Sequence, residues 1–216
     1  MSMSRRCLIR IALGLTLTSA LAWAGKNFVM PAAQPAKSYP AHDAHPDENI
    51  TVGLDPYDMP DKADIFTVKY KEVGYLPIFM VITNDGDQPV SLHDMRVQFI
   101  TVDRTKISPA TEDDLYRRIS RPTKSSNTIP LPFPKSGKIK GTVGEKAMDE
   151  IQNSRFIARA VEPHSSQSGF LFFDVSGIST PLAGAHLYLT GAIDSKGNEL
   201  MYFEIPLEKY LSAPGK

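Results

Sequence analysis

The chain has 216 residues, of which 24 are lysine or arginine and 24 are aspartate or glutamate, so its formal net charge is zero. A near-neutral chain of this length has no global electrostatic reason to bind nucleic acid, and we expect no nucleic-acid partner. Its single cysteine, Cys7, excludes a disulfide within the chain and any paired-cysteine metal site.

Residues 1–24 have the three-part layout of a secretory signal peptide. Basic Arg5 and Arg6 precede an apolar run at 11–21, which is too short for a membrane-spanning helix, and a small-x-small cleavage pattern follows at 22–24. We therefore predict cleavage before Gly25 and a periplasmic or secreted product with no transmembrane helix, with an uncleaved anchor as the alternative. The paired arginines also resemble a twin-arginine export motif, so both export routes stay open.

Residues 25–63 are acidic and rich in proline, with prolines at positions 31, 35, 40 and 46 in the first half. Proline cannot donate to a strand ladder, and it favours an extended conformation in the residue before it. We therefore predict that residues 25–63 form an N-terminal strap on the surface of a domain that begins at residue 64.

Two histidines of this strap, in the sequence YPAHDAHPDE, are candidate metal ligands. His42 and His45, with Asp43 between them, offer the imidazole and carboxylate groups that zinc and copper bind in proteins. This pattern gives periplasmic metal binding as an alternative function. The competing interpretation is a solvated acidic strap whose histidines cap turns.

Seven segments have the hydrophobic pattern of strands, and turn-forming residues separate them. Residues 75–83 are apolar on both sides, which is typical of a central strand covered on two faces. Asp85-Gly86 and the sequence DSKGNE, at 194–199, are typical of hairpin turns. The other expected strands are 64–70, 95–102, 155–161, 169–175, 186–194 and 199–205.

The strand pattern stops at 104–153, where we predict a long inserted loop that carries one or two short helices. Thr111 with Asp114 has the spacing of a capping box, and Thr142 with Glu145 repeats it. Without this insertion, residues 64–208 have about the size of one immunoglobulin-like domain. The sequence therefore predicts an all-β fold, an immunoglobulin-like antiparallel β-sandwich over 64–208, followed by a C-terminal tail at 209–216.

The inserted loop contains the proline-rich, basic sequence RPTKSSNTIPLPFPKSGKIKG at 121–141. Long loops in compact domains are often functional, and a basic one favours an acidic envelope protein, an anionic surface or a surface that recognises polyproline. The other interpretation is a solvated loop that pairs with the chain's own acidic residues at 43–64. The candidate partner-binding residues are Arg117, Arg118, Arg121, Lys124, Lys135, Lys138 and Lys140.

The sequence EPHSSQSGFLFFDVSG, at 162–177, contains the residue types of a hydrolase triad. An extended strand over 169–175 would separate Asp174 from His164, Ser165 and Ser166, and no G-x-S-x-G elbow is present. We therefore interpret this stretch as a turn that leads into a buried strand. No phosphate-binding loop, dinucleotide fingerprint or H-E-x-x-H motif occurs, so we expect no enzyme activity and no cofactor.

Three stretches, FMVITNDGDQPVSL, VEPHSSQSGFLFFDV and HLYLTGAIDSKGNELMYFEIPL, together resemble exported bacterial immunoglobulin-like domains of unknown function. In that class an N-x-G turn separates early strands, and a Pro-His/Gly-Ser turn precedes an aromatic strand. The resemblance implies an immunoglobulin-like fold in the cell envelope. The expected function is thus a non-enzymatic, exported binding or structural module of the envelope.

Overall fold

The structure of the chain is a computed structural model that describes residues 27–120 and 144–208. The predicted signal peptide, the segment 121–143 and the predicted C-terminal tail lie outside these described residues. The described part is mostly β, and its named strands pair with one another in the antiparallel sense. The prediction of a β fold is confirmed, although the helices make the fold mostly β rather than all-β.

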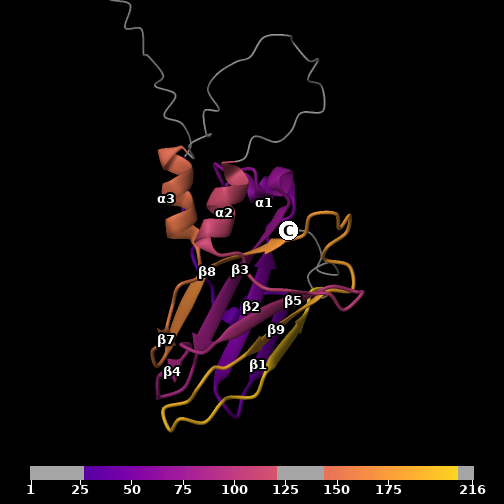
Figure 1. Cartoon of the computed structure of the whole chain (residues 1–216). Coiled ribbons are helices and arrows are strands. Elements are labelled where there is room, and N and C mark those ends of the chain that lie inside the picture. Colours follow the sequence, from indigo (N-terminus) through magenta and orange to yellow (C-terminus); the bar gives the residue numbers. More distant parts are fainter. Residues whose placement is uncertain (1–26, 121–143, 209–216) are drawn as a thin grey trace, which may run out of the picture.

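Two four-stranded sheets form the body of the molecule (Figure 1). The first sheet has the order β1 (Ala41–His45), β2 (Ile50–Pro56), β3 (Tyr75–Asn84) and β8 (Ser165–Asp174). The second sheet has the order β10 (Phe203–Pro206), β9 (His186–Thr190), β5 (Arg96–Ile100) and β6 (Lys106–Ile107). A short separate ladder joins β4 (Val90–Ser91) to β7 (Ala160–Val161).

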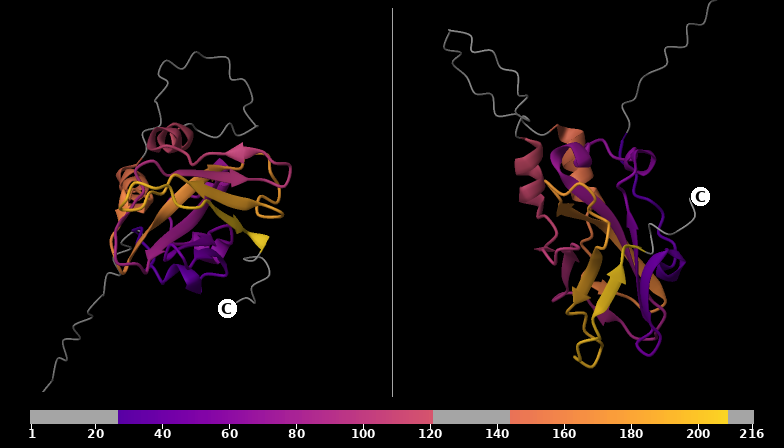
Figure 2. Two further views of the ribbon diagram at one scale, coloured as in Figure 1. Left: turned by 90° about the horizontal axis from the view of Figure 1, so that it is seen from below. Right: turned by 90° about the vertical axis from the view of Figure 1, so that its right-hand side faces the viewer.

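The three α-helices lie together at one end of the strands (Figures 1 and 2). They are α1 (Pro60–Ala63), α2 (Glu112–Ile119) and α3 (Glu145–Ser154), and two 3-10 helices are also present, η1 (Ala36–Ser38) and η2 (Tyr70–Val73). The predicted helices of the insertion are therefore confirmed. Thr111 and Asp114 form the predicted capping box of α2, whereas Gly144 is the N-cap of α3 and Thr142 lies outside the described residues.

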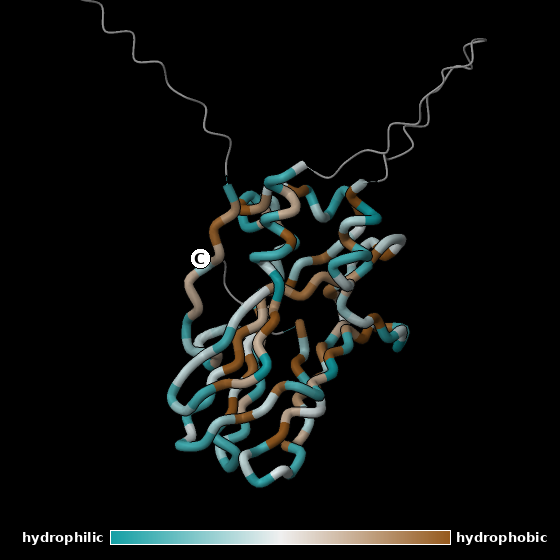
Figure 3. Tube along the Cα trace, turned by 60° about the vertical axis from the view of Figure 1, so that its left-hand side comes forward, coloured by the Kyte–Doolittle hydropathy of each residue, from teal (hydrophilic) through white to brown (hydrophobic). Residues whose placement is uncertain are grey.

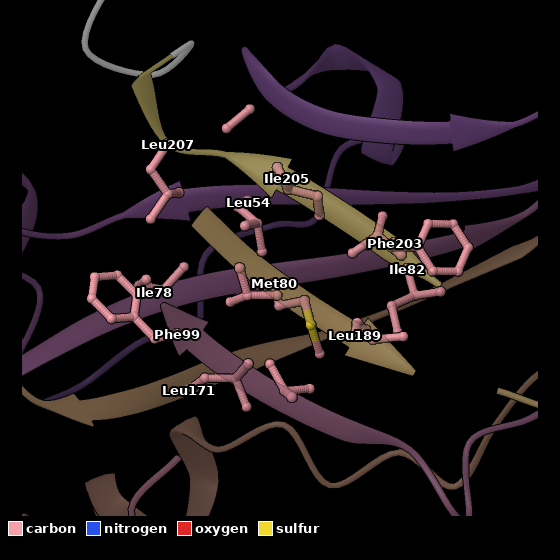
Figure 4. Packing of buried hydrophobic residues seen from close by; sticks show 14 of the residues in the cluster. Leu54, Ile78, Met80, Ile82, Phe99, Leu171, Leu189, Phe203, Ile205 and Leu207 are labelled. Carbon is pink, nitrogen blue, oxygen red and sulfur yellow. The ribbon is translucent and has the colours of Figure 1, made fainter. Parts of the chain in front are cut away.

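The main core lies between the two sheets (Figure 4). Ile78 and Met80 of β3 face Phe99 of β5 and Leu189 of β9, and all four side chains are buried. Full burial of each such side chain stabilises the fold by about 1.5–3 kcal/mol. Two antiparallel sheets that share one core are consistent with a β-sandwich.

A second core covers the outer face of the first sheet. Phe79 of β3 and Phe170 of β8 pack there against Phe66, Leu115 of α2 and Ile151 of α3. Strand β3 is therefore buried along its full length, as the apolar sequence at 75–83 predicts. In Figure 3 the hydrophobic segments run along the paired strands, and the turns at the end opposite the helices are mostly hydrophilic.

The segment predicted as a strap supplies two strands of the first sheet, β1 and β2. The sheet therefore begins at Ala41 rather than at residue 64. Pro40 precedes β1 and Pro46 follows it, so neither proline occupies an interior ladder position. The part before Ala41 lies across the sheet, where Ala36 N donates to Thr83 Oγ1 at 2.9 Å.

Three expected strands are wrong over most of their length, and of residues 199–205 only 203–205 belong to a strand, β10. Residues 64–70 form turns that lead into η2, and their apparent alternation comes from Phe66 and Tyr70, which pack onto the second core. Of residues 155–161, only Ala160–Val161 is a strand. The chain before it crosses the edge of β8, where Phe156 N donates to Phe170 O at 3.0 Å.

Candidate functional site

The structure does not bring the two candidate metal-binding histidines together. Side chains alternate along β1, so His45 lies on the same face as Ala41 of the main core, and His42 lies on the opposite face. The ring of His42 hydrogen bonds with Tyr39 O instead. Within residues 27–120 and 144–208, no three or more His, Cys, Asp or Glu side chains are grouped to hold a metal ion. The prediction of a site at His42, His45 and Asp43 is therefore not supported.

Instead, His45 and its carboxylate neighbours join the edges of the two sheets. His45 Nδ1 lies 2.9 Å from Glu48 Oε2, and its ring stacks on Phe203 of β10 at 4.0 Å between ring centroids. Asp43 Oδ2 accepts from Glu204 N at 3.1 Å, and Glu48 Oε1 accepts from Met201 N at 2.8 Å. These carboxylates cover backbone donors that an edge strand would otherwise expose.

We expect His45→Ala to lower the free energy of unfolding by about 1–2 kcal/mol, because it removes an aromatic stack and a hydrogen bond. His42→Ala is the matched control, and it should have a smaller effect because its hydrogen bond with Tyr39 O is local. Urea denaturation of both variants measures the difference. Equal destabilisation by the two changes would show that His45 does not join the sheets.

The possible triad residues lie at opposite ends of β8, which confirms the turn-and-strand interpretation. Ser165 begins this ten-residue strand and Asp174 ends it, which corresponds to about 30 Å at 3.3 Å per residue. His164 has a left-handed backbone, with φ at 52°, and its Nε2 lies 3.0 Å from Asp87 Oδ1. Ser165 Oγ donates to Glu162 O at 2.8 Å within the turn.

Two of the predicted partner-binding residues, Arg117 and Arg118, line a hollow of about 670 Å³ beside α2. We call it the arginine hollow. Helix α2 is fixed at this place because Ala110 N, just before the capping box, donates to Phe172 O of β8 at 2.7 Å. The other lining residues are Tyr75, Ser108, Pro109, Ala110, Thr111, Asp114 and Asp174.

Both arginines are already paired within the arginine hollow. Arg118 forms a salt bridge with Asp174, donates to Ser176 Oγ at 3.4 Å and lies over the ring of Tyr75, 5.5 Å from the centroid. Arg117 forms a salt bridge with Asp114. These pairs balance the charges of the hollow, and the Arg118–Asp174 pair fixes the last turn of α2 to the end of the first sheet.

Two pKa shifts reflect this arrangement. Burial raises the pKa of Tyr75, and the neighbouring Arg118 partly opposes that shift. Hydrogen bonds from Thr111 lower the pKa of Asp114, and Arg117 lowers it further. At neutral pH the tyrosine is therefore a neutral wall of the hollow, and Asp114 is an ionised cap of α2.

Tyr75 also lines a second hollow of about 510 Å³ on its other side, which sequence reasoning missed. We call it the apolar hollow. It lies between the start of β3 and the loop 175–183, and Tyr57, Asp58 and Lys71 complete its rim. The proline and small residues of that loop were visible in the sequence, but no local pattern indicated that the loop would face β3.

The other predicted partner-binding residues, Arg121, Lys124, Lys135, Lys138 and Lys140, lie outside the described residues. Where the structure describes the chain, none of its helices has both the length and the apolar character needed to cross a membrane. In comparisons with known proteins, no family model, no curated protein and no solved structure matched this chain.

Proposed function

We propose that the protein is a non-enzymatic, exported immunoglobulin-like module of the cell envelope that binds an anionic surface. The observation that supports this most is the attachment of α2. Arg118 and Asp174 fix its last turn to the sheet, directly before the basic segment 121–143. The cationic segment thus begins at a fixed point of the domain, and loops on a scaffold commonly carry function.

Charge favours an anionic surface over a single acidic ligand. Because Arg117 and Arg118 are already paired, the arginine hollow offers no excess positive charge to a specific anion. The segment 121–143 contains no acidic residue, and each basic side chain near an anionic membrane contributes about 1 kcal/mol. Its five basic residues are Arg121, Lys124, Lys135, Lys138 and Lys140.

Two further observations support the remaining parts of the proposal. The separation of His164 and Ser165 from Asp174 favours a binding role over hydrolysis. Two antiparallel sheets around one core have the layer arrangement of an immunoglobulin-like domain. Export rests on the signal-peptide pattern of residues 1–24.

The test is sedimentation of the chain 25–216 with vesicles of phosphatidylglycerol and phosphatidylethanolamine. Changing the five basic residues of 121–143 to glutamine should reduce the partition coefficient at least tenfold, and raising the salt concentration should weaken binding by the parent chain. Vesicles of phosphatidylcholine alone should bind little of either protein.

A matched control removes the same number of charges from exposed positions elsewhere. This variant should bind nearly as well as the parent chain, because its charges lie away from the helical end. Equal loss in both variants, or no binding to anionic vesicles at low salt, would overturn the proposal. The control changes to glutamine are at Lys37, Arg96, Arg104, Lys106 and Lys196.

A further inference from the structure

We infer that the apolar hollow is the binding site for the chain's own C-terminal segment, 209–216, with Tyr210 and Leu211 as the inserted side chains. This site is separate from the cationic segment 121–143, and the inference does not depend on the anionic surface proposed above. It follows from the chemistry of the hollow, from the place where the described chain leaves the second sheet, and from the sequence after it.

The hollow has the size and the lining of an apolar binding site. Its volume of about 510 Å³ lies within the range of protein pockets that hold small ligands, so it can take two side chains. Leu76 and Leu182 form its buried floor, and Ile178 stands at the rim with 36% of its surface exposed. Covering such an exposed apolar rim is favourable because it removes hydrocarbon from water.

The last described residues end close to this hollow. Leu207 is fully buried, and its N donates to Ala185 O at 2.9 Å, two residues after Ala183 of the hollow's lining. Three residues of extended chain span about 10 Å, which is enough for a chain that leaves Leu207 to bring Tyr210 to the hollow's wall. The side chain of Glu208 already lies beside Gly184.

The sequence of the segment, KYLSAPGK, matches the hollow. Tyr210 and Leu211 are its two large apolar side chains, and small or polar residues follow them. A short tether gives such side chains a local concentration in the millimolar range. The chain's own segment is therefore favoured over a free ligand of the same chemistry.

Occupancy of the apolar hollow has a structural consequence for Arg118. The loop that forms one wall contains Ser176, whose hydroxyl accepts from Arg118, and Tyr75 separates the two hollows. A bound C-terminal segment would hold this loop against β3. It would thereby keep Ser176 next to Arg118 and stabilise the Arg118–Asp174 pair.

Disulfide trapping tests the inference in a favourable background, because the predicted mature chain has no cysteine. A disulfide requires Cα atoms about 4.4–6.8 Å apart, so Ile178→Cys with Leu211→Cys should form one within the monomer under mild oxidation. The control is Val102→Cys with Leu211→Cys. Val102 is 75% exposed and lies next to Gly184, within reach of the segment but outside the hollow.

We expect the Ile178 pair to form at least tenfold faster than the Val102 pair, and Tyr210→Ser to slow the Ile178 pair at least threefold. Equal rates for the two pairs, or a rate that does not change with Tyr210→Ser, would show that the segment only passes the hollow by chance. Neutralising the five basic residues of 121–143 should leave the trapping rate unchanged, so this experiment and the vesicle test can fail separately.

Discussion

Replacing Gly169 with alanine is expected to lower the free energy of unfolding by about 3 kcal/mol, the upper end of the usual cost of overpacking. A Cβ atom at this position would lie 2.5 Å from Phe156 Cα and 2.6 Å from Phe156 N. The crossing chain cannot move away easily, because Phe156 N donates to Phe170 O at 3.0 Å. Urea or thermal denaturation measures the loss, which corresponds to roughly 6–12 °C in Tm for a domain of this size.

Gly144→Ala is the matched control for this prediction. A Cβ atom there meets no other atom within 4 Å, and the backbone φ of −61° suits any residue. We expect a loss of less than about 1 kcal/mol, because Gly144 is the N-cap of α3 and alanine is a poorer N-cap residue than glycine. If Gly169→Ala cost no more than this control, the close crossing at β8 would not exist.

Replacing Glu150 with alanine is expected to lower the free energy of unfolding by about 3 kcal/mol. Its side chain belongs to α3 and is 1% exposed, and the carboxylate accepts hydrogen bonds from Thr67 N and, at 3.2 Å, from Val68 N. Removing the carboxylate leaves two backbone donors without their acceptor under the helix. Hydrogen exchange at Thr67 and Val68 should accelerate along with the loss measured by denaturation.

Two variants separate this effect from the general cost of changing α3. Glu150→Gln keeps one carbonyl acceptor and should lose about half as much stability. Glu145→Ala changes an exposed carboxylate of the same helix and should cost less than about 0.5 kcal/mol. Similar losses for Glu145→Ala and Glu150→Ala would show that Glu150 does not attach α3 to the segment 64–70.

The contact of Glu150 with the segment 64–70 lies beside the buried Tyr70, and sequence reasoning missed it. Burial raises the pKa of Tyr70, and the negative charge of Glu150 raises it further. The apolar Ile151 of α3 is buried, but a carboxylate on a buried face has no signature in a hydrophobic pattern. The accepting carboxylate of Glu150 and the two backbone donors come from segments more than 80 positions apart in the sequence.

Part of the candidate site, the arginine hollow, was also predictable from the sequence. Arg117 and Arg118 were recognisable as cations in the last turn of a helix, because capping and charge position are local properties. The salt bridges that these arginines form with Asp114 and Asp174 differ in how far they could be predicted from local sequence. The Asp114 pair follows from helical spacing, whereas the Asp174 pair depends on where α2 docks. His42 and His45 looked close in sequence, but strand alternation separates them.

Three elements depend on neighbours along the chain and were predictable from the amino-acid order: the buried strand β3, the capping box of α2, and the turn that separates β7 from β8. Three other features became visible in the folded chain: β1 and β2 join the first sheet, Gly169 lies under a crossing chain, and Tyr75 stands between two hollows. The two groups differ in the range of the interactions that produce them. Periodicity and capping act over a few residues, whereas sheet edges, chain crossings and hollows arise from contacts between segments that only folding brings together.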